Sequence, residues 1–341
     1  MKSWWWCLLL FVHISCAKRI YDVAYPTLGD GKYDSEFPYK DCSKQLAEIS
    51  ETVKMIYSTA FYKTYLFSEE TKVKPSDLKD ESILKKSVKT LYSHNSVSGT
   101  ATILYYQDKK IALLTCAHIV DFPDTSLSYY SRGQDGDVIK SVSIRERQTN
   151  FIRDLPEGGE VEILASDVGL DIAIVGQTLK AVPEKPLPIF RYPIGKSKEL
   201  EWGTYLYIIG YPMGYKMITN GIVSSPNRDK KGSFLTDAPF NRGFSGGIVL
   251  AIRDGVPNFE LVGMAKSVAA NYEFILTPSK EFDQSAYNPG MPYEGEVFVE
   301  QKTDIRYGIT NSISTETIGQ FIRDHKKDFE AKEFYLQTLF P

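Results

Sequence analysis

Short runs of apolar and β-branched residues, separated by polar turns, dominate the chain between about residues 88 and 313. Polar turns such as 107–110 and 253–255 break the runs. Many short strands at this spacing predict an all-β sandwich or barrel. The runs that we assign to strands are TATILYY, IALLTC, VEILA, DIAIVG, TYLYIIG, GIVLAI and ELVGMA.

A proline-rich stretch divides these strands into two sets. Four prolines fall between DIAIVG and TYLYIIG, and prolines of this kind are typical of a connecting segment. We therefore expect two all-β lobes, joined by a linker near residues 177–200. Residues 276–303 are expected to be a polar insertion before the final strand, YGITNSI.

Two other segments carry apolar residues at helical spacing. Residues 44–57 predict an amphipathic helix within an N-terminal extension, 18–87, which could be a regulatory cap or part of the first lobe. A C-terminal helix is predicted after Ser314, with 326–341 as its end and the tail. The apolar positions are Leu46, Ile49, Val53 and Ile56 in the first helix, and Ile318, Phe321, Ile322 and Phe329 in the second.

The N-terminus has the pattern of a signal peptide, residues 1–17. Lys2 is followed by an apolar run at 4–12, which is too short to span a bilayer, and then by small residues. Cleavage after Ala17 is the interpretation that we favour, and lipidation of Cys16 is the alternative. We therefore expect an exported protein, periplasmic or extracellular, with membrane attachment only through a lipidated Cys16.

Composition and charge narrow the function classes further. The chain is 43% hydrophobic and 24% charged, with a formal net charge of −3. Nucleic-acid binding is not expected, because no concentrated basic patch is present. Export would permit a disulfide between Cys42 and Cys116, but the sequence does not supply its geometry, so this pairing stays open.

The stretch NRGFSGG, residues 241–247, has three possible interpretations. It could be a G-x-S-x-G nucleophile elbow of an esterase, a G-x-S-G-G loop of a serine peptidase, or a plain surface turn. A serine nucleophile needs a base to take its proton and an acid to orient that base. The rest of the chain therefore has to supply both.

Among the four histidines, His118 is the candidate base, because it ends the apolar strand IALLTCAHIV. His13 leaves with the signal peptide, His94 is expected in a polar surface turn, and His325 is expected on the charged face of the last helix. A lone buried histidine is more often a core residue than a catalyst, so His118 needs a partner.

Asp171 is the candidate partner, because it places a carboxylate inside the apolar strand GLDIAIVG. Burying that charge is costly unless another group pairs with it, and His118 would do so. Asp121 and Asp124 are weaker candidates, since VDFPDT resembles an exposed turn.

Ser245 is the candidate nucleophile, and the glycines around it let backbone N–H groups converge. The N–H groups of Gly243 and Ser245 would form the oxyanion hole. The esterase interpretation fails because a strand, not a helix, follows Ser245, and only His325 comes later. The order His118, Asp171, Ser245 is that of chymotrypsin-type peptidases.

Three motifs resemble the catalytic motifs of trypsin-like serine peptidases, most closely the HtrA-type branch. These are LLTCAHIV, GLDIAIV and TDAPFNRGFSGG, and four further stretches fit in order: GTYLYIIGYPMGY, NGIVSS, LVGMAKS and YGITNSIS. The resemblance covers 88–325, where it implies a double β-barrel with the active site between the barrels. It also implies a serine endopeptidase that needs no cofactor or metal and acts on protein or peptide substrates.

Some positions depart from that family. Arg242 stands where proline is usual, Phe244 where asparagine is usual, and Ile248 where proline commonly follows the paired glycines. Losing a rigid φ before the loop suggests an oxyanion hole that forms only on substrate binding. A catalytically weak protease-fold binding protein therefore remains the alternative.

The resemblance also gives expectations for specificity. No acidic residue maps to the base of the S1 pocket, which argues for small or medium apolar P1 residues rather than Lys or Arg. The residues expected to bind substrate are Pro239, Phe240, Met264, Ala265 and Lys266.

Overall fold

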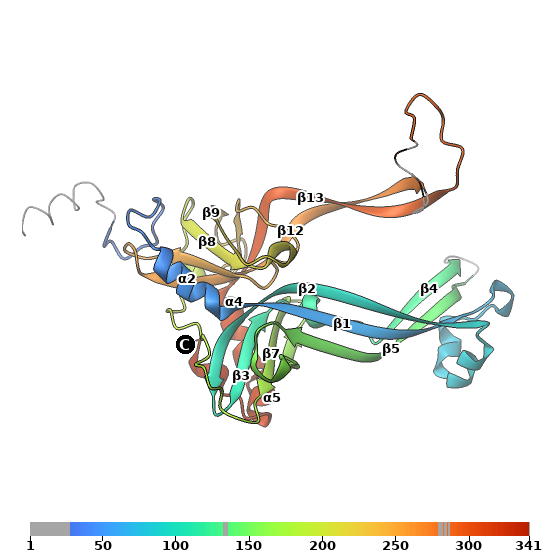
Figure 1. The fold of residues 1–341 in the computed structure, drawn as a ribbon, viewed down its shortest axis with the longest axis horizontal. Coiled ribbons are helices and arrows are strands. Elements are labelled where there is room, and N and C mark those ends of the chain that lie inside the picture. Colours follow the sequence, from blue (N-terminus) through green and yellow to red (C-terminus); the bar gives the residue numbers. More distant parts are fainter. Residues whose placement is uncertain (1–27, 132–135, 279–281, 283–284, 286, 341) are drawn as a thin grey trace, which may run out of the picture.

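The computed structural model describes residues 28–131, 136–278, 282, 285 and 287–340. The expected signal peptide and Cys16 lie outside the described residues. Strands dominate the described chain and form a seven-stranded sheet and a closed six-stranded barrel (Figure 1). This arrangement confirms the expected all-β fold class of two lobes.

The seven-stranded sheet contains all strands before the linker. Its strand order is β4-β5-β1-β2-β3-β7-β6, and every neighbouring pair is antiparallel. Its strands are β1 (Val53–Leu66), β2 (Lys89–Gln107), β3 (Lys110–Thr115), β4 (Thr125–Ser131), β5 (Val138–Ile152), β6 (Glu162–Asp167) and β7 (Ile172–Thr178).

The predicted helix at 44–57 is wrong in its second half. Helix α2 covers only Ser43–Thr52, and β1 begins at Val53, where the backbone becomes extended. β1 pairs with β2 on one side and with β5 on the other. These two ladders satisfy the backbone N–H and carbonyl groups of β1. Val53 and Ile56 are therefore strand residues, and their side chains are buried in the core. The first sheet thus begins before residue 88, where we expected the peptidase domain to start.

The closed barrel contains the strands after the linker, in the order β10-β13-β12-β11-β8-β9. One hydrophobic cluster includes Ile103 and Ile174 of the sheet and Leu250 of the barrel, so the two lobes pack on each other. The strands are β8 (Tyr205–Gly210), β9 (Met217–Ser225), β10 (Phe234–Thr236), β11 (Ile248–Ile252), β12 (Phe259–Pro278) and β13 (Val297–Ser314).

The linker between β7 and β8 runs along both lobes. The Phe190 N–H donates to the Ile103 carbonyl in the sheet, and the Leu261 N–H of the barrel donates to Pro193, both at 2.9 Å. The short 3₁₀ helices are η1 (Glu69–Thr71), η2 (Pro75–Lys79), η3 (Glu81–Lys86), η4 (Pro156–Gly158), η5 (Ser197–Glu199), η6 (Pro212–Gly214) and η8 (Leu336–Thr338).

The C-terminal helix occurs where its pattern predicted it. Helix α4 (Thr315–Asp324) begins after Ser314, whose hydroxyl accepts a hydrogen bond from the Thr317 N–H as an N-cap. A second helix, α5 (Lys326–Ala331), follows directly after His325. None of the helices in the described part of the chain is long and apolar enough to cross a membrane.

The expected polar insertion at 276–303 begins and ends in a β-ribbon, because β12 runs to Pro278 and β13 starts at Val297. β12 and β13 stay paired from Gly263–Ser314 out to Pro278–Val297, and the ribbon extends away from the barrel (Figure 1). The prediction missed the ribbon because Phe274, Leu276 and Val299 are largely exposed on it.

The N-terminal extension also contacts the barrel. The Tyr33 hydroxyl donates to Glu260 at 2.6 Å and accepts from the Lys196 N–H at 2.9 Å. The Arg253 guanidinium lies 3.9 Å from the centre of the Tyr33 ring and pairs with Glu260. Residues around Tyr33 are therefore attached to the second lobe, whereas β1 belongs to the first.

We expect Asp34→Asn to raise the melting temperature more at pH 7.5 than at pH 4. Partial burial, together with the acids Glu36, Asp254 and Asp30, raises the pKa of Asp34 to about 6, although a hydrogen bond from the Gly255 N–H opposes the shift. Because the pKa of Asp34 is higher in the folded protein than its ordinary value of 3.8, protonated Asp34 stabilises the fold at pH values below 3.8. This stabilisation is lost as the pH rises through about 6 and the carboxyl ionises.

Asparagine keeps an oxygen for the Gly255 N–H but carries no charge. The expected gain at pH 7.5 is about 2 °C, because solvent screens a half-exposed carboxyl. Thermal melts of Asp34→Asn and wild type at both pH values make the comparison, and an equal change at both would contradict the assigned pKa.

Candidate active site

His118 and Asp171 lie against each other where two neighbouring strands of the first sheet, β3 and β7, end and begin. His118 is in the short helix α3 (Ala117–Val120), which follows β3, and Asp171 directly precedes β7. Because β3 and β7 are paired, the two side chains meet. Nδ1 of His118 lies 2.9 Å from both carboxylate oxygens of Asp171.

The Asp171 side chain is 8% exposed, whereas the His118 side chain is 43% exposed. The His118 backbone N–H also donates to Asp171 Oδ1, at 3.0 Å. These contacts compensate for the burial of the carboxylate and fix the orientation of the imidazole. The remaining ring nitrogen, Nε2, is therefore the atom available to accept a proton.

Ser245 lies in a tight loop between β10 and β11 that only glycines can form. Gly243 has a φ of +106° and Gly246 a φ of +85°. A Cβ at Gly243 would lie 2.2 Å from the Tyr211 carbonyl oxygen, and one at Gly246 would lie 2.0 Å from the Thr100 oxygen. The close approach to Thr100 brings the loop against the first lobe, next to the strand that leads to His118.

The backbone N–H groups of Gly243 and Ser245 have no hydrogen-bond partner among the described residues. The Arg242 carbonyl, in the same peptide unit as the Gly243 N–H, accepts from the Met213 N–H at 2.9 Å. In a trans peptide the two groups point in opposite directions, so this bond turns the Gly243 N–H away from Met213.

Thr100 is a positioning residue that the sequence analysis missed. Its hydroxyl donates to the Gly243 carbonyl at 2.6 Å and accepts from the Tyr211 N–H at 2.9 Å. Its own N–H donates to the Ser245 carbonyl at 2.8 Å. These bonds join the serine loop to both lobes, and no motif marks a threonine in the middle of an apolar strand as their source.

Phe244 anchors the loop by burial. It is 2% exposed, and its ring centroid lies 5.7 Å from that of Phe240 inside the barrel. Gly210 leaves room for it, because a Cβ there would lie 2.8 Å from the Phe244 ring. Apolar packing therefore holds the residue before Ser245 without a charged partner.

The Ser245 hydroxyl donates to the Lys266 backbone carbonyl at 3.0 Å. Within the described chain it has no hydrogen bond to His118. The structure therefore brings His118 and Asp171 into contact on the first lobe. The Ser245 hydroxyl belongs to the second lobe, where it donates to a backbone carbonyl of β12.

The residues expected to bind substrate differ in accessibility. Pro239 is exposed and Lys266 is half-buried, but Phe240, Met264 and Ala265 are buried. The Ala265 N–H and carbonyl are both bonded to the serine loop. A substrate can therefore reach Pro239 and Lys266, whereas Ala265 supports the loop.

His94 and His325 belong to other elements than this pair. His94 is exposed on β2, where we had expected a turn, because 89–107 is a continuous strand paired with β1. His325 bonds to Asp328 at 2.8 Å on the C-terminal helices.

Cys116 is fully buried beside the pair. Its Sγ, a ring nitrogen of His118 and a carboxylate oxygen of Asp171 all lie within 4.8 Å of one another, as the ligands of a metal ion would. Burial, and then the Asp171 charge, raise the pKa of its thiol, whereas metals bind the thiolate. This set therefore suits a metal ion poorly. Cys116 and Cys42 are both free thiols, so the disulfide that the sequence left as a possibility is not formed.

Comparison with known proteins agrees with this geometry. Residues 99–264 match the model of the trypsin-like peptidase domain. Over these residues the chain is similar to trypsin-like peptidases. It is also 26% identical over 184 residues, 52% of its length, to a probable periplasmic serine endoprotease DegP-like of Pseudomonas fluorescens. The match covers 33% of that protein. Both findings support a serine protease and confirm the resemblance near the HtrA branch.

We expect Gly243→Ala to lower peptidase activity about 10²- to 10³-fold, the usual effect of losing one oxyanion-hole donor. The new Cβ would collide with the Tyr211 carbonyl oxygen, so the peptide carrying the Gly243 N–H has to move. Hydrolysis rates measure the loss. Gly203→Ala is the matched control, because Gly203 has a φ of +82° with open space around it. Equal losses in both variants would contradict the role of Gly243.

Proposed function

We propose that the protein is an exported serine endopeptidase that cleaves peptide bonds through Ser245, His118 and Asp171. The observation that carries the proposal is a combination of two features. Buried Asp171 is paired with His118, and the N–H groups of Gly243 and Ser245 have no partner within the described part of the chain. The word "periplasmic" in the relative's name supports export.

The first half of the proposed reaction forms an acyl-enzyme. The Ser245 hydroxyl leaves the Lys266 carbonyl by rotation about its Cα–Cβ bond and donates to Nε2 of His118. Its oxygen then attacks the scissile carbonyl carbon while His118 takes the proton, and Asp171 stabilises the imidazolium. The Gly243 and Ser245 N–H groups donate to the oxyanion. His118 next protonates the leaving amine, and the C–N bond breaks.

The second half releases the product. Water gives a proton to His118 and attacks the acyl carbon, and the same two N–H groups stabilise the second oxyanion. Collapse of this intermediate breaks the ester bond, and the proton returns from His118 to Ser245. Water is the only co-reactant, so this cycle needs no cofactor.

The second candidate function is a protease-fold protein that binds polypeptides without cleaving them. The Ser245–Lys266 hydrogen bond favours it, because the hydroxyl donates to that carbonyl and not to His118 in this conformation. Catalytic hydrogen bonds often form only with substrate bound, so the endopeptidase remains our conclusion.

Incubation with a denatured protein separates the two functions. We expect mass spectrometry to show internal cleavage and, after rapid acid quenching, a peptide esterified to Ser245. Binding of the denatured protein without cleavage would favour the second function.

A further inference from the structure

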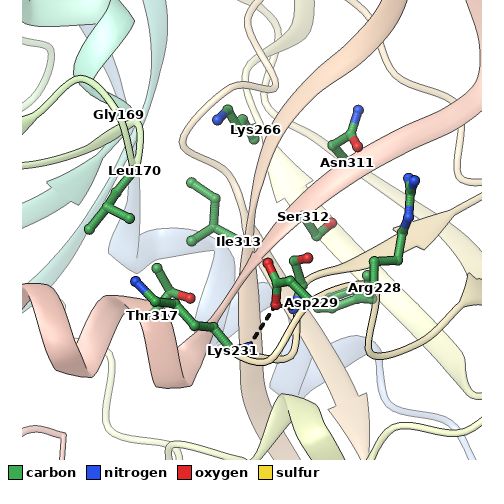
Figure 2. Close-up of a pocket in the computed structure, with 12 residues that line it drawn as sticks. Gly169, Leu170, Arg228, Asp229, Lys231, Lys266, Asn311, Ser312, Ile313 and Thr317 are labelled. Carbon is green, nitrogen blue, oxygen red and sulfur yellow. Dashed lines mark hydrogen bonds between the residues drawn. The ribbon is translucent and has the colours of Figure 1, made fainter.

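A basic pocket lies beside the candidate active site, with a volume of about 550 Å³ (Figure 2). Its wall combines the loop before Asp171, the loop between β9 and β10, the β12–β13 pair and the start of α4. We define it by Leu170, Arg228, Lys231, Lys266, Ser312 and Ile313.

Three cationic side chains surround this pocket: those of Arg228, Lys231 and Lys266. None of them forms an ion pair with another residue that the structure describes. The one acid in the wall, Asp229, accepts hydrogen bonds from the N–H groups of Lys231 and Ser233, at 2.8 and 3.0 Å. Its carboxylate is thus occupied by its own loop, and the pocket keeps an excess of positive charge.

The basic pocket also has an apolar surface. Leu170 and Ile313 line the opposite part of the pocket from Arg228 (Figure 2). Methylene groups fit the apolar part, while a carboxylate fits the cations.

The basic pocket is continuous with the proposed active site through two residues. The Lys266 side chain lines the pocket, while its backbone carbonyl accepts the hydrogen bond of Ser245. Leu170, on the other wall, directly precedes Asp171. A side chain in the pocket and a scissile bond at Ser245 can therefore belong to one extended polypeptide.

We propose that the basic pocket is a substrate subsite that receives an acidic side chain, glutamate or aspartate, of the polypeptide to be cleaved. This inference rests on the proposed function. The subsite is separate from the expected S1 pocket near Pro239. It selects substrates with an acidic residue at a fixed distance from the scissile bond.

Binding to the Ser245→Ala protein tests the subsite without cleavage. The probes are a fluorescein-labelled peptide with several glutamates and the same peptide with glutamines. Fluorescence anisotropy is expected to give about tenfold tighter binding of the glutamate peptide, because two or three partly exposed ion pairs each contribute modestly. Adding Arg228→Gln and Lys231→Gln should remove this preference.

Lys185→Gln with Arg191→Gln is the matched control. It removes the same charge from exposed residues outside the pocket and should keep the preference. Equal binding of both peptides, or equal loss in the two double variants, would overturn the proposal. Cleavage by the wild-type protein is measured separately. A preference for the glutamate peptide without cleavage would support the subsite and contradict the endopeptidase function. Cleavage without that preference would support the endopeptidase function and contradict the subsite.

Discussion

Ser245→Ala is expected to lower the kcat of peptide hydrolysis about 10⁶-fold, the size of loss typical when a peptidase loses its nucleophilic serine. The hydroxyl is the group that forms the ester bond in the proposed reaction, and no neighbouring side chain can replace it. The only bond of this hydroxyl that the structure gives is to the Lys266 carbonyl, so its removal should leave the fold intact.

Ser93→Ala is the control, because Ser93 is an exposed serine on β2. It should keep full activity, and thermal melts should show all three proteins folded. Hydrolysis of a fluorogenic peptide by Ser245→Ala at the wild-type rate would mean that another group, or a contaminating enzyme, performs the reaction.

The second large effect is expected for Asp171→Asn, with a loss of about 10⁴-fold in kcat. The change keeps the shape of the side chain but replaces one carboxylate oxygen with an amide donor. Nδ1 of His118 now contacts both oxygens. An amide nitrogen at either place favours the tautomer with the proton on Nε2, and His118 could then no longer accept the proton of Ser245.

Asp124→Asn is the matched control for that variant. Asp124 lies in the exposed turn that follows His118 in the sequence, and its side chain is 87% exposed. We expect near wild-type activity, measured as kcat on the same fluorogenic peptide. A similar small effect of both substitutions would contradict the role of Asp171 as the group that orients His118.

Much of the fold could be predicted from apolar runs. Each run assigned to a strand lies in β2, β3, β6, β7, β8, β11 or β12, because buried strands leave long apolar stretches. β1 was missed because Leu46, Ile49, Val53 and Ile56 happen to follow helical spacing across the junction of α2 and β1. Pairing with two distant strands decides the structure there, and local pattern does not contain that information.

The site could be predicted where burying a charged side chain would cost free energy without a partner. A carboxylate in an apolar strand required a partner, and the structure brings Asp171 to His118. The role of Thr100 was not predictable, because its hydroxyl bonds join residues more than a hundred positions away. The direction of the Ser245 hydroxyl depends on one side-chain torsion, which no sequence pattern specifies.

The central claim is that Ser245 is activated by His118, and labelling with a fluorophosphonate probe tests it most directly. The proteins compared are wild type, Ser245→Ala, His118→Ala and His325→Ala, the last as control because His325 lies on the C-terminal helices. We predict labelling of wild type and His325→Ala and none of the other two. Absence of labelling in folded wild type, or undiminished labelling of His118→Ala, would contradict the account.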